Sequence, residues 1–213
     1  GPASAISFLG AGELLAVGNR SGTVIHDLRS GETVKELLGQ LGGGSVVLSP
    51  RGDVLVTSGG GSVTLWETGS WQPLRRLPDV SGPLAFSPDG QILATGSNEG
   101  IILWDLARER KVTLNDSAVP LRSFFPGGTR ILFSPDGKTV LAPHVEKSEL
   151  GIFYLGAWDV GNGEELGVLP ATPADVGHSG MITSLAADWE GQVMASSSWD
   201  HSVLLWDLTT RRL

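Results

Sequence analysis

A four-residue turn recurs along this chain. Ser-Pro-Asp-Gly stands at 87–90 and at 134–137, and a variant, Ser-Pro-Arg-Gly, stands at 49–52. Proline presets φ at the second position of a tight turn, aspartate is accepted at the third, and glycine adopts the left-handed conformation. Gly-Ala-Gly at 10–12 and Asp-Trp-Glu-Gly at 188–191 fill the equivalent places in two further units. Each of these turns predicts a hairpin that joins two strands.

Short apolar strands surround each turn. The strands before the turns are expected at Ala5–Leu9, Ser45–Leu48, Leu84–Phe86, Ile131–Phe133 and Ile182–Leu185. The strands after the turns are expected at Leu14–Val17, Val54–Val56, Ile92–Ala94, Val140–Ala142 and Val193–Ala195. A third strand then ends in an aromatic and an acidic residue, at Trp66-Glu67, Trp104-Asp105, Trp158-Asp159 and Trp206-Asp207. His26-Asp27 takes this place in the first unit, and a more polar fourth segment follows each pair.

The spacing of these units predicts the fold class. Starting from His26, the third-strand aromatic positions are separated by 40, 38, 54 and 48 residues. A unit of about 40 residues with four short strands is typical of a propeller blade. No stretch sustains a helical 3.6-residue apolar period for three turns. We therefore expect an all-β protein, a single β-propeller domain over residues 1–213 with about five four-stranded blades at approximately 3–44, 45–82, 83–129, 130–180 and 181–213.

In its motifs the chain resembles the WD40-repeat family. The resemblance rests on Phe-Ser-Pro-Asp-Gly at 86–90 and 133–137, Leu-Ala-Thr-Gly-Ser-Asn-Glu-Gly at 93–100, Leu-Trp-Asp-Leu at 103–106 and 205–208, and Gly177-His178. It covers nearly the whole chain and implies a WD40-type propeller. This fold serves many unrelated binding tasks, so the resemblance identifies the fold far better than the function.

The resemblance also implies a buried hydrogen-bond network in the fifth unit. In the family this network joins a histidine before the blade, a serine or threonine on the second strand, an aspartate in the following turn, and the third-strand tryptophan. Those positions fall on His178, Ser196 or Ser198, Asp200 and Trp206. A buried indole N–H needs an acceptor, and a hydroxyl can accept from it and donate onward to an imidazole. We expect this network to be structural.

The same residues raise the alternative of a hydrolase, because serine, histidine and aspartate crowd into residues 196–202. A serine nucleophile requires an exposed hydroxyl beside a histidine, with a pocket of donors for the oxyanion. Neither a Gly-x-Ser-x-Gly motif nor a strand-to-helix turn is visible around these serines. We therefore expect no catalytic residues, and we expect His201 to be an exposed turn residue.

Composition narrows the range of partners. The chain has a formal net charge of −8 and scattered basic residues, so we expect no nucleic-acid binding. It contains no cysteine, which excludes disulfides, thiolate catalysis and cysteine-ligated metals. No apolar run approaches the roughly 18 residues of a membrane span, and no signal peptide is visible. We expect a cytoplasmic protein that makes no membrane contact.

Two further motifs resemble ligand sites. Gly-Lys-Thr at 137–139 resembles the end of a phosphate-binding loop, but the required first glycine is replaced by Leu132 and the segment is a hairpin. His144, Glu146 and Glu149 could supply ligands to a metal, but a solvated hairpin is the simpler interpretation. We expect no cofactor and no metal.

The loops are the expected partner-binding surface. Trp199 lies just before the turn at 200, on the face that WD40 proteins commonly use for partners, where an exposed tryptophan can anchor a ligand. The alternative is that Trp199 packs against the neighbouring blade. His201, Asn98 and Arg20 are the other candidate partner-binding residues.

Five units are fewer than the usual seven of WD40 proteins, and the last unit barely reaches its fourth strand. The ring either belongs to a larger propeller or closes with five blades, and we expect a partial propeller within a larger protein. An unpaired edge at Ala5–Leu9 or at the last blade would invite strand addition by another chain. The sequence leaves the oligomeric state open.

The leading functional hypothesis is a non-catalytic WD40 interaction or scaffold module that binds a protein or peptide through its loop face. The alternatives are a small-ligand or carbohydrate-binding propeller and a propeller hydrolase. A carbohydrate site would favour aromatic residues repeated at one loop position, and the positions matching Trp199 are polar or glycine. A hydrolase would need acidic or histidine residues converging on the central channel, whereas the first strands are apolar.

Overall fold

β-Strands are the only long regular elements in the described part of this computed structural model, and they form five antiparallel sheets. The structure describes residues 3–9, 12–19, 21–38, 44–97, 100–115, 131–145, 153–169, 177–188, 190 and 192–209. Within these ranges there is no helix long and apolar enough to cross a membrane. The all-β fold class expected from the sequence is confirmed.

Each sheet is one blade, and its strands follow one another in chain order. Blade 1 contains β1 (Ala3–Leu9), β2 (Leu14–Asn19), β3 (Gly22–Asp27) and β4 (Thr33–Leu38). Blade 2 contains β5 (Val46–Leu48), β6 (Val54–Gly59), β7 (Ser62–Glu67) and β8 (Pro73–Pro78). Blade 3 contains β9 (Val80–Phe86), β10 (Ile92–Ser97), β11 (Gly100–Asp105) and β12 (Arg110–Asn115).

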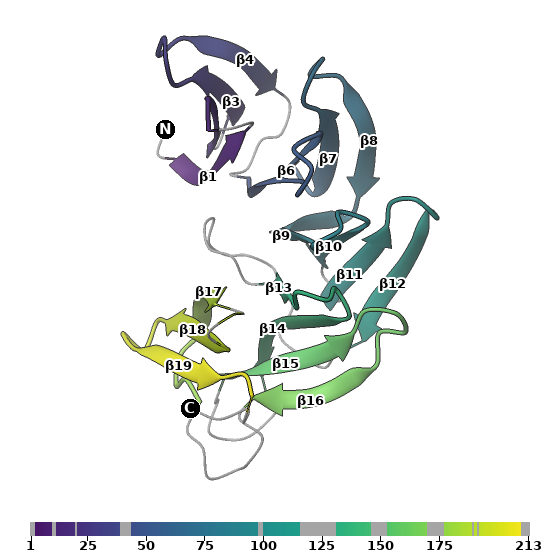
Figure 1. Ribbon diagram of the computed structural model, residues 1–213, viewed down its shortest axis with the longest axis vertical. Coiled ribbons are helices and arrows are strands. Elements are labelled where there is room, and N and C mark those ends of the chain that lie inside the picture. Colours follow the sequence, from purple (N-terminus) through teal and green to yellow (C-terminus); the bar gives the residue numbers. More distant parts are fainter. Residues whose placement is uncertain are drawn as a thin grey trace.

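Blade 4 contains β13 (Leu132–Phe133), β14 (Thr139–Val145), β15 (Phe153–Asp159) and β16 (Glu165–Leu169). The described strands of blade 5 are β17 (Ile182–Asp188), β18 (Val193–Ser198) and β19 (Val203–Asp207). The blades follow one another around an arc, with β1–β4 at one end and β17–β19 at the other (Figure 1). This arrangement confirms the propeller expected from the repeat.

Side chains alternate between the two faces of each blade, and this alternation builds a core between blades. On β11, Trp104 packs with residues of blade 2, whereas Leu103 packs with residues of blade 4. Trp158 and Trp206 likewise face the preceding blades. Among the described residues, buried clusters join blades 1 and 2, 2 and 3, 3 and 4, and 4 and 5. Because apolar burial contributes roughly 25 cal/mol per Å², these interfaces are the main source of stability.

The recurring turn closes through its serine and aspartate. Ser87 Oγ donates to Asp89 Oδ1 over 2.6 Å and accepts from the amide of Ile92 at 2.9 Å. The turn at 134–137 has the same hydrogen bonds. Gly90 has a φ of 72°, a conformation that costs glycine little and other residues more. The hairpins predicted from this motif are therefore present, and side chains as well as backbone hold them.

The turn between the third and fourth strands also places one residue in the left-handed conformation. Gly31 and Gly163 fill this position in blades 1 and 4, with φ values of 75° and 77°. Trp71 and Glu109 fill it in blades 2 and 3, with φ values of 56° and 54°. A residue with a Cβ is strained there by about 1 kcal/mol. Two blades therefore carry a strain that the other two avoid.

Replacing Glu109 with glycine is expected to raise the free energy of unfolding by about 0.5 kcal/mol, because relief of strain exceeds the added entropy of the unfolded chain. The ion pair between Arg75 and Glu109, at 3.6 Å, is exposed and contributes little. Urea denaturation of the wild type, Glu109→Gly and Glu109→Ala would measure the effect. Glu109→Ala removes the charge but keeps the strain, so an equal gain in both variants would contradict this explanation.

The arc has an open side between its two ends. Among the described residues, no buried cluster joins blade 5 to blade 1. In blades 1 to 4 a fourth strand pairs with the third, whereas in the described part of blade 5 no strand pairs with the outer edge of β19. Both ends of the arc therefore present sheet surface that the described chain does not cover.

Candidate functional site

Four side chains of blade 5 form one continuous hydrogen-bonded chain. Trp206 Nε1 on β19 donates to Ser196 Oγ on β18 over 2.7 Å. Ser196 Oγ lies 2.7 Å from His178 Nε2, and His178 Nδ1 lies 2.9 Å from Asp200 Oδ2. His178 precedes β17, and Asp200 lies in the turn between β18 and β19. The structure thus brings together residues that are up to 28 positions apart in the sequence.

The partners determine the direction of each hydrogen bond. An indole N–H can only donate, so the Ser196 hydroxyl accepts from Trp206 and directs its own proton toward the imidazole. His178 Nε2 then accepts, and His178 Nδ1 carries the proton that it donates to the Asp200 carboxylate. The tautomer with its proton on Nδ1 satisfies all four groups, an assignment that rests on these partners.

Further hydrogen bonds hold the Asp200 turn against the loop that carries His178. Asp200 Oδ2 also accepts from the amide of Ser179 at 3.0 Å, and Asp200 Oδ1 accepts from the amide of Ser202 at 2.9 Å. Ser198 Oγ donates to the carbonyl of Gly180 over 2.8 Å. A Cβ on Gly180 would lie 2.7 Å from the Asp200 amide nitrogen, so only glycine lets loop and turn come this close.

The sequence left the second-strand position open between Ser196 and Ser198. Register decides between them, because Met194 pairs with Trp206 and Ser196 lies two residues further along the same face of β18. Ser196 is therefore the residue that joins Trp206 to His178. Ser198 lies beyond it, where its hydroxyl also accepts from the Asp200 amide at 3.2 Å.

The environment of Asp200 favours its charged form. Burial of the carboxylate opposes ionisation, but hydrogen bonds from Ser202, His178 and Ser179 outweigh it. Together they hold the pKa of the Asp200 carboxyl well below its ordinary value of 3.8. Asp200 is thus negatively charged when it accepts the hydrogen bonds that join the loop to the turn.

The lowered pKa of Asp200 predicts an acid-sensitive contribution to stability. The contribution is fully present above the unfolded pKa, near 3.8, and is lost as the pH falls toward the folded pKa. We expect the free energy of unfolding to fall more steeply below pH 4 in the wild type than in Asp200→Asn. Urea denaturation at a series of pH values would measure both slopes, with Asp188→Asn as the exposed control. Equal slopes in the wild type and Asp200→Asn would contradict the prediction.

Ser196, His178 and Asp200 have the hydrogen-bond order of a catalytic triad. Their accessibility is different from that of a triad. The side chains of Ser196 and His178 are both 0% exposed, and the serine oxygen already accepts the Trp206 indole proton. A substrate carbonyl could not approach the Ser196 hydroxyl without opening the interface between blades 4 and 5. The geometry therefore supports a role in holding the blade.

Two other blades keep part of this arrangement. Trp66 Nε1 donates to Thr57 Oγ1 over 2.9 Å in blade 2, and Trp104 Nε1 donates to Thr95 Oγ1 over 3.0 Å in blade 3. In blade 4 the register places Ala142, which has no hydroxyl, at the equivalent position. Among the described residues, only blade 5 extends the tryptophan–hydroxyl pair through a histidine to an aspartate. The loop before blade 5 is thus tied to its blade by His178 and Asp200, in addition to the tryptophan–hydroxyl pair that blades 2 and 3 share.

Two of the four candidate partner-binding residues, Trp199 and His201, lie within the described residues. Trp199 directly precedes Asp200 and its side chain is 50% exposed. His201 is also exposed and has a φ of 66°. Arg20 and Asn98 lie outside the described residues. Trp199 and His201 therefore flank Asp200, on the turn that the network holds.

Neither of the two other sequence motifs forms a ligand site in the described residues. Gly137 and Lys138 lie in the turn between β13 and β14, and Thr139 is the first residue of β14. Of the three possible metal ligands, Glu146 and Glu149 lie outside the described residues, as does the side chain of His144. No group of three or more histidine, aspartate or glutamate side chains is arranged to hold a metal in the part that the structure describes.

Comparison with known proteins identifies the repeat. The family model "WD domain, G-beta repeat" matches residues 84–105 and 169–207. These residues include β10 and β11 of blade 3 and all described strands of blade 5, together with His178 and Asp200. The chain is a β-propeller that contains WD40 repeats.

The similar proteins agree on the fold of this WD40 propeller. Its backbone resembles the β-propeller domain of Cps50 (Swd1) from Myceliophteria thermophila, with a TM-score of 0.74 and 21% identity over 96% of this chain and 65% of that one. It also resembles hydrazine synthase of Kuenenia stuttgartiensis, with a TM-score of 0.70 and 19% identity over 92% of this chain and 55% of that one. At these identities the likeness concerns the fold alone.

One curated relative is similar in sequence. The "Periodic tryptophan protein 2 homolog" of Schizosaccharomyces pombe is 32% identical over 92 residues, which are 41% of this chain and 10% of that protein. The WD40 propeller described here therefore matches about a tenth of that relative. A match of this extent does not carry the activity or partners of that relative over to this chain.

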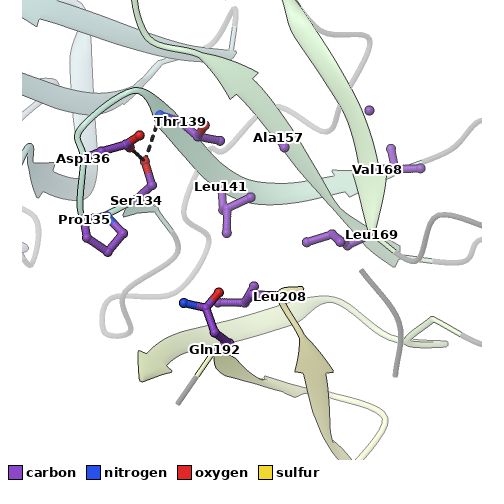
Figure 2. A pocket seen from close by; sticks show the side chains of 11 residues that line it. Ser134, Pro135, Asp136, Thr139, Leu141, Ala157, Val168, Leu169, Gln192 and Leu208 are labelled. Atoms are coloured by element: carbon purple, nitrogen blue, oxygen red, sulfur yellow. Dashed lines mark hydrogen bonds between the residues drawn. The ribbon is translucent and has the colours of Figure 1, made fainter. Parts of the chain in front are cut away.

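A pocket of about 420 Å³ lies between blades 4 and 5 of the propeller. Figure 2 shows Leu141 and Leu169 of blade 4 facing Gln192 and Leu208 of blade 5, with the Asp136 turn to one side. The remaining lining residues are Ser134, Pro135, Thr139, Ala157, Gly167 and Val168. The walls are mainly aliphatic and include no aromatic side chain. Sequence analysis missed this pocket because no motif links the separate segments that line it.

Proposed function

We propose that this chain is a non-catalytic WD40 interaction module that binds a protein or peptide through the turn at Trp199 and His201. The observation that carries the proposal is the exposure of Trp199, a large apolar side chain at the tip of a turn that the network holds. Its backbone amide donates to the carbonyl of Met181 at 3.1 Å, which further anchors the turn. Partly exposed tryptophans on rigid turns lose little entropy on binding and are frequent anchors.

The charges around Trp199 suit a ligand with a basic or hydrogen-bond-donating group. Asp200 keeps its negative charge to low pH, and the protein carries a formal net charge of −8. A peptide with an apolar residue beside a lysine or arginine would place the apolar group on Trp199. Its cation would be attracted by the overall acidic surface.

Peptide selection tests this function. A random peptide library would be selected on the wild-type chain, and the affinity of the selected peptide would be measured by isothermal titration calorimetry. Trp199→Ala is expected to weaken binding by at least ~10-fold, the effect of losing a binding anchor. Leu74→Ala is the matched control, because Leu74 is 56% exposed on β8, away from blade 5. Equal affinities of Trp199→Ala and wild type for every selected peptide would reject the proposed site.

The pocket between blades 4 and 5 favours a second candidate function, the binding of a small aliphatic ligand. Its aliphatic walls offer no aromatic platform for a sugar ring, which argues against carbohydrate. Ala157→Leu would reduce the space in the pocket, because Ala157 lines it on the face of β15 that packs with blade 5. Ligand-observed NMR with a library of aliphatic fragments should then show binding to the wild type and not to Ala157→Leu. Equal binding of the fragments to both proteins would reject this pocket as a ligand-binding site.

A further inference from the structure

The pocket between blades 4 and 5 lies where blade 4 carries smaller residues than the other blades. Two of its lining residues, Ala157 and Thr139, face blade 5. Register equates Ala157, one residue before the third-strand aromatic position, with Ile25, Leu65 and Leu103. It equates Thr139, the first residue of β14, with Leu14, Val54 and Ile92. The space therefore has its origin in the sequence of blade 4.

Leu141 restores part of this volume. It pairs with Ala157, and it also lines the pocket. Its equivalents in blades 1 to 3 are the smaller Ala16, Val56 and Ala94. Leucine at 141 thus compensates for the side chain that is missing at 157. The remaining loss of volume falls at Thr139 and on the fourth strand.

The fourth strands of other blades show what fills this place. Gly167 on β16 pairs with Ala157, and its equivalents are Lys35, Arg75 and Val112. In blade 2 the Arg75 guanidinium reaches blade 3, where it lies 3.6 Å from the Glu109 carboxylate. A Cβ on Gly167 would meet no heavy atom within 4 Å. Blades 1 and 2 thus carry an aliphatic stem with a cation on the face where blade 4 has open space.

Strand pairing does not require glycine at this position. The register between β15 and β16 shifts between Ala157 and Trp158, and the same shift occurs in blades 1 and 2 beside Lys35 and Arg75. Gly167 has a φ of 125°, whereas Lys35 and Arg75 have ordinary negative φ values. The open space is therefore a property of blade 4 that the fold does not impose.

One carboxylate faces this space. Among the described residues that line the pocket, Asp136 is the only ionisable one. Its Oδ1 accepts from Ser134 Oγ at 2.6 Å and from the Lys138 amide at 3.0 Å, and these bonds hold the pKa of the Asp136 carboxyl below its ordinary value of 3.8. Within the described part of the chain, Oδ2 accepts no hydrogen bond and Asp136 forms no ion pair. The pocket thus combines aliphatic walls with one negative charge.

From these walls and this charge we propose that the pocket binds an aliphatic chain that ends in an ammonium group. The chain lies against Leu141, Ala157 and Leu169, and the ammonium lies at Asp136. Figure 2 shows the Asp136 turn at one side of the pocket and Leu169 at the other. The volume of about 420 Å³ lies within the range of ~300–1,000 Å³ that is usual for ligand pockets.

The proposal rests on the second candidate function, the binding of an aliphatic ligand, and adds the charge of that ligand. A lysine side chain of a partner protein and a free alkylamine share this chemistry. Gln192 lines the pocket directly before β18, whereas Trp199 directly follows β18. The ammonium site and the proposed peptide-binding turn therefore lie at opposite ends of one strand.

Ligands with one chain and three different charges test the proposal. Pentylamine, 1-pentanol and hexanoate carry the same pentyl chain, and the amine is charged at pH 7 because the pKa of an alkylammonium is about 10.4. Dissociation constants would be measured by NMR titration of the isotope-labelled 213-residue chain. Pentylamine should bind about 3–5-fold more tightly than 1-pentanol, which is the scale of an exposed ion pair. Hexanoate should bind most weakly, because its carboxylate is repelled by Asp136.

Two matched variants separate the charge from the turn. Asp136→Asn should remove the advantage of pentylamine and leave the affinity for 1-pentanol unchanged, because asparagine keeps an oxygen for the Ser134 and Lys138 donors. Asp89→Asn makes the same change in the same turn of blade 3 and should alter neither affinity. Ala157→Leu should weaken the binding of both ligands.

The outcomes distinguish this proposal from the function on which it rests. Equal affinities of the wild type for pentylamine and 1-pentanol, or a preference for the amine that persists in Asp136→Asn, would overturn the ammonium site but keep an aliphatic ligand. Absence of binding by both would overturn the two together. The peptide acetyl-Gly-Lys-Gly-amide, with its Nε-acetylated form as the neutral control, identifies the source. Tighter binding of this peptide than of pentylamine would assign the site to a lysine of a partner protein, and the reverse would assign it to a free alkylamine.

Discussion

Replacing Asp200 with alanine is expected to lower the free energy of unfolding by about 2–3 kcal/mol, because a buried hydrogen-bond network loses the acceptor at its end. Four donors lose their partner at once: His178 Nδ1, the Ser179 amide, and the amide and hydroxyl of Ser202. The His178 loop would also lose its attachment to the turn between β18 and β19. Urea denaturation followed by tryptophan fluorescence would measure the loss.

The matched control is Asp207→Ala. Asp207 also accepts from a turn amide, that of Thr209 at 2.8 Å, but it lies exposed at the end of β19. Its replacement should cost about 1 kcal/mol or less. A loss below about 0.5 kcal/mol for Asp200→Ala would show that the network contributes little to stability.

Ser196→Val is expected to have an effect of similar size, about 2–4 kcal/mol, because it removes the hydroxyl between two buried donor–acceptor groups. The Trp206 indole N–H would lose its acceptor, and His178 Nε2 would lose its donor. Valine fills nearly the volume of threonine, so the change tests the hydroxyl more than the packing. Thermal or urea denaturation of the pure variants would give the difference.

Ser196→Thr is the control that separates hydrogen bonding from steric effects. Thr57 and Thr95 hold the equivalent position in blades 2 and 3, and each accepts from the tryptophan of its own blade. Threonine at 196 should therefore cost less than about 1 kcal/mol. If Ser196→Thr and Ser196→Val lost equal stability, the shape of the side chain and not its hydroxyl would be the requirement.

The fold could be predicted from the sequence because each blade repeats its own local signals. The Ser-Pro-Asp-Gly turns determine where strands reverse, and the third-strand aromatic positions mark the blade period. Strand ends were less predictable: the strand expected at Leu14–Val17 extends to Asn19, and that expected at Val54–Val56 extends to Gly59. Both extensions add polar or glycine residues, which a search for apolar runs does not recognise.

The site was only partly predictable. His178, Asp200 and Trp206 followed from the family resemblance, but the choice between Ser196 and Ser198 depended on strand register. The exposure of Trp199 could not be derived from sequence, because packing on a neighbouring blade was equally consistent with its position. The pocket between blades 4 and 5 depends on how two sheets meet, and no local pattern encodes that contact.

Burial separates two interpretations of the same three residues. Ser196, His178 and Asp200 are hydrogen-bonded as in a hydrolase, yet the serine and histidine lie inside the interface between blades 4 and 5. In this position the network can hold the turn that presents Trp199. The proposed binding function and the stabilising role of the network are thus linked through one turn.

Covalent labelling of Ser196 tests this account most directly. The native protein would be incubated with a fluorophosphonate, which reacts with activated serine hydroxyls, and the modified residues would be identified by peptide mass spectrometry. We predict no modification of Ser196 in the folded protein, because its hydroxyl is buried and bonded to Trp206 and His178. Stoichiometric modification of Ser196 that disappears in His178→Ala would contradict a structural network and would indicate a hydrolase.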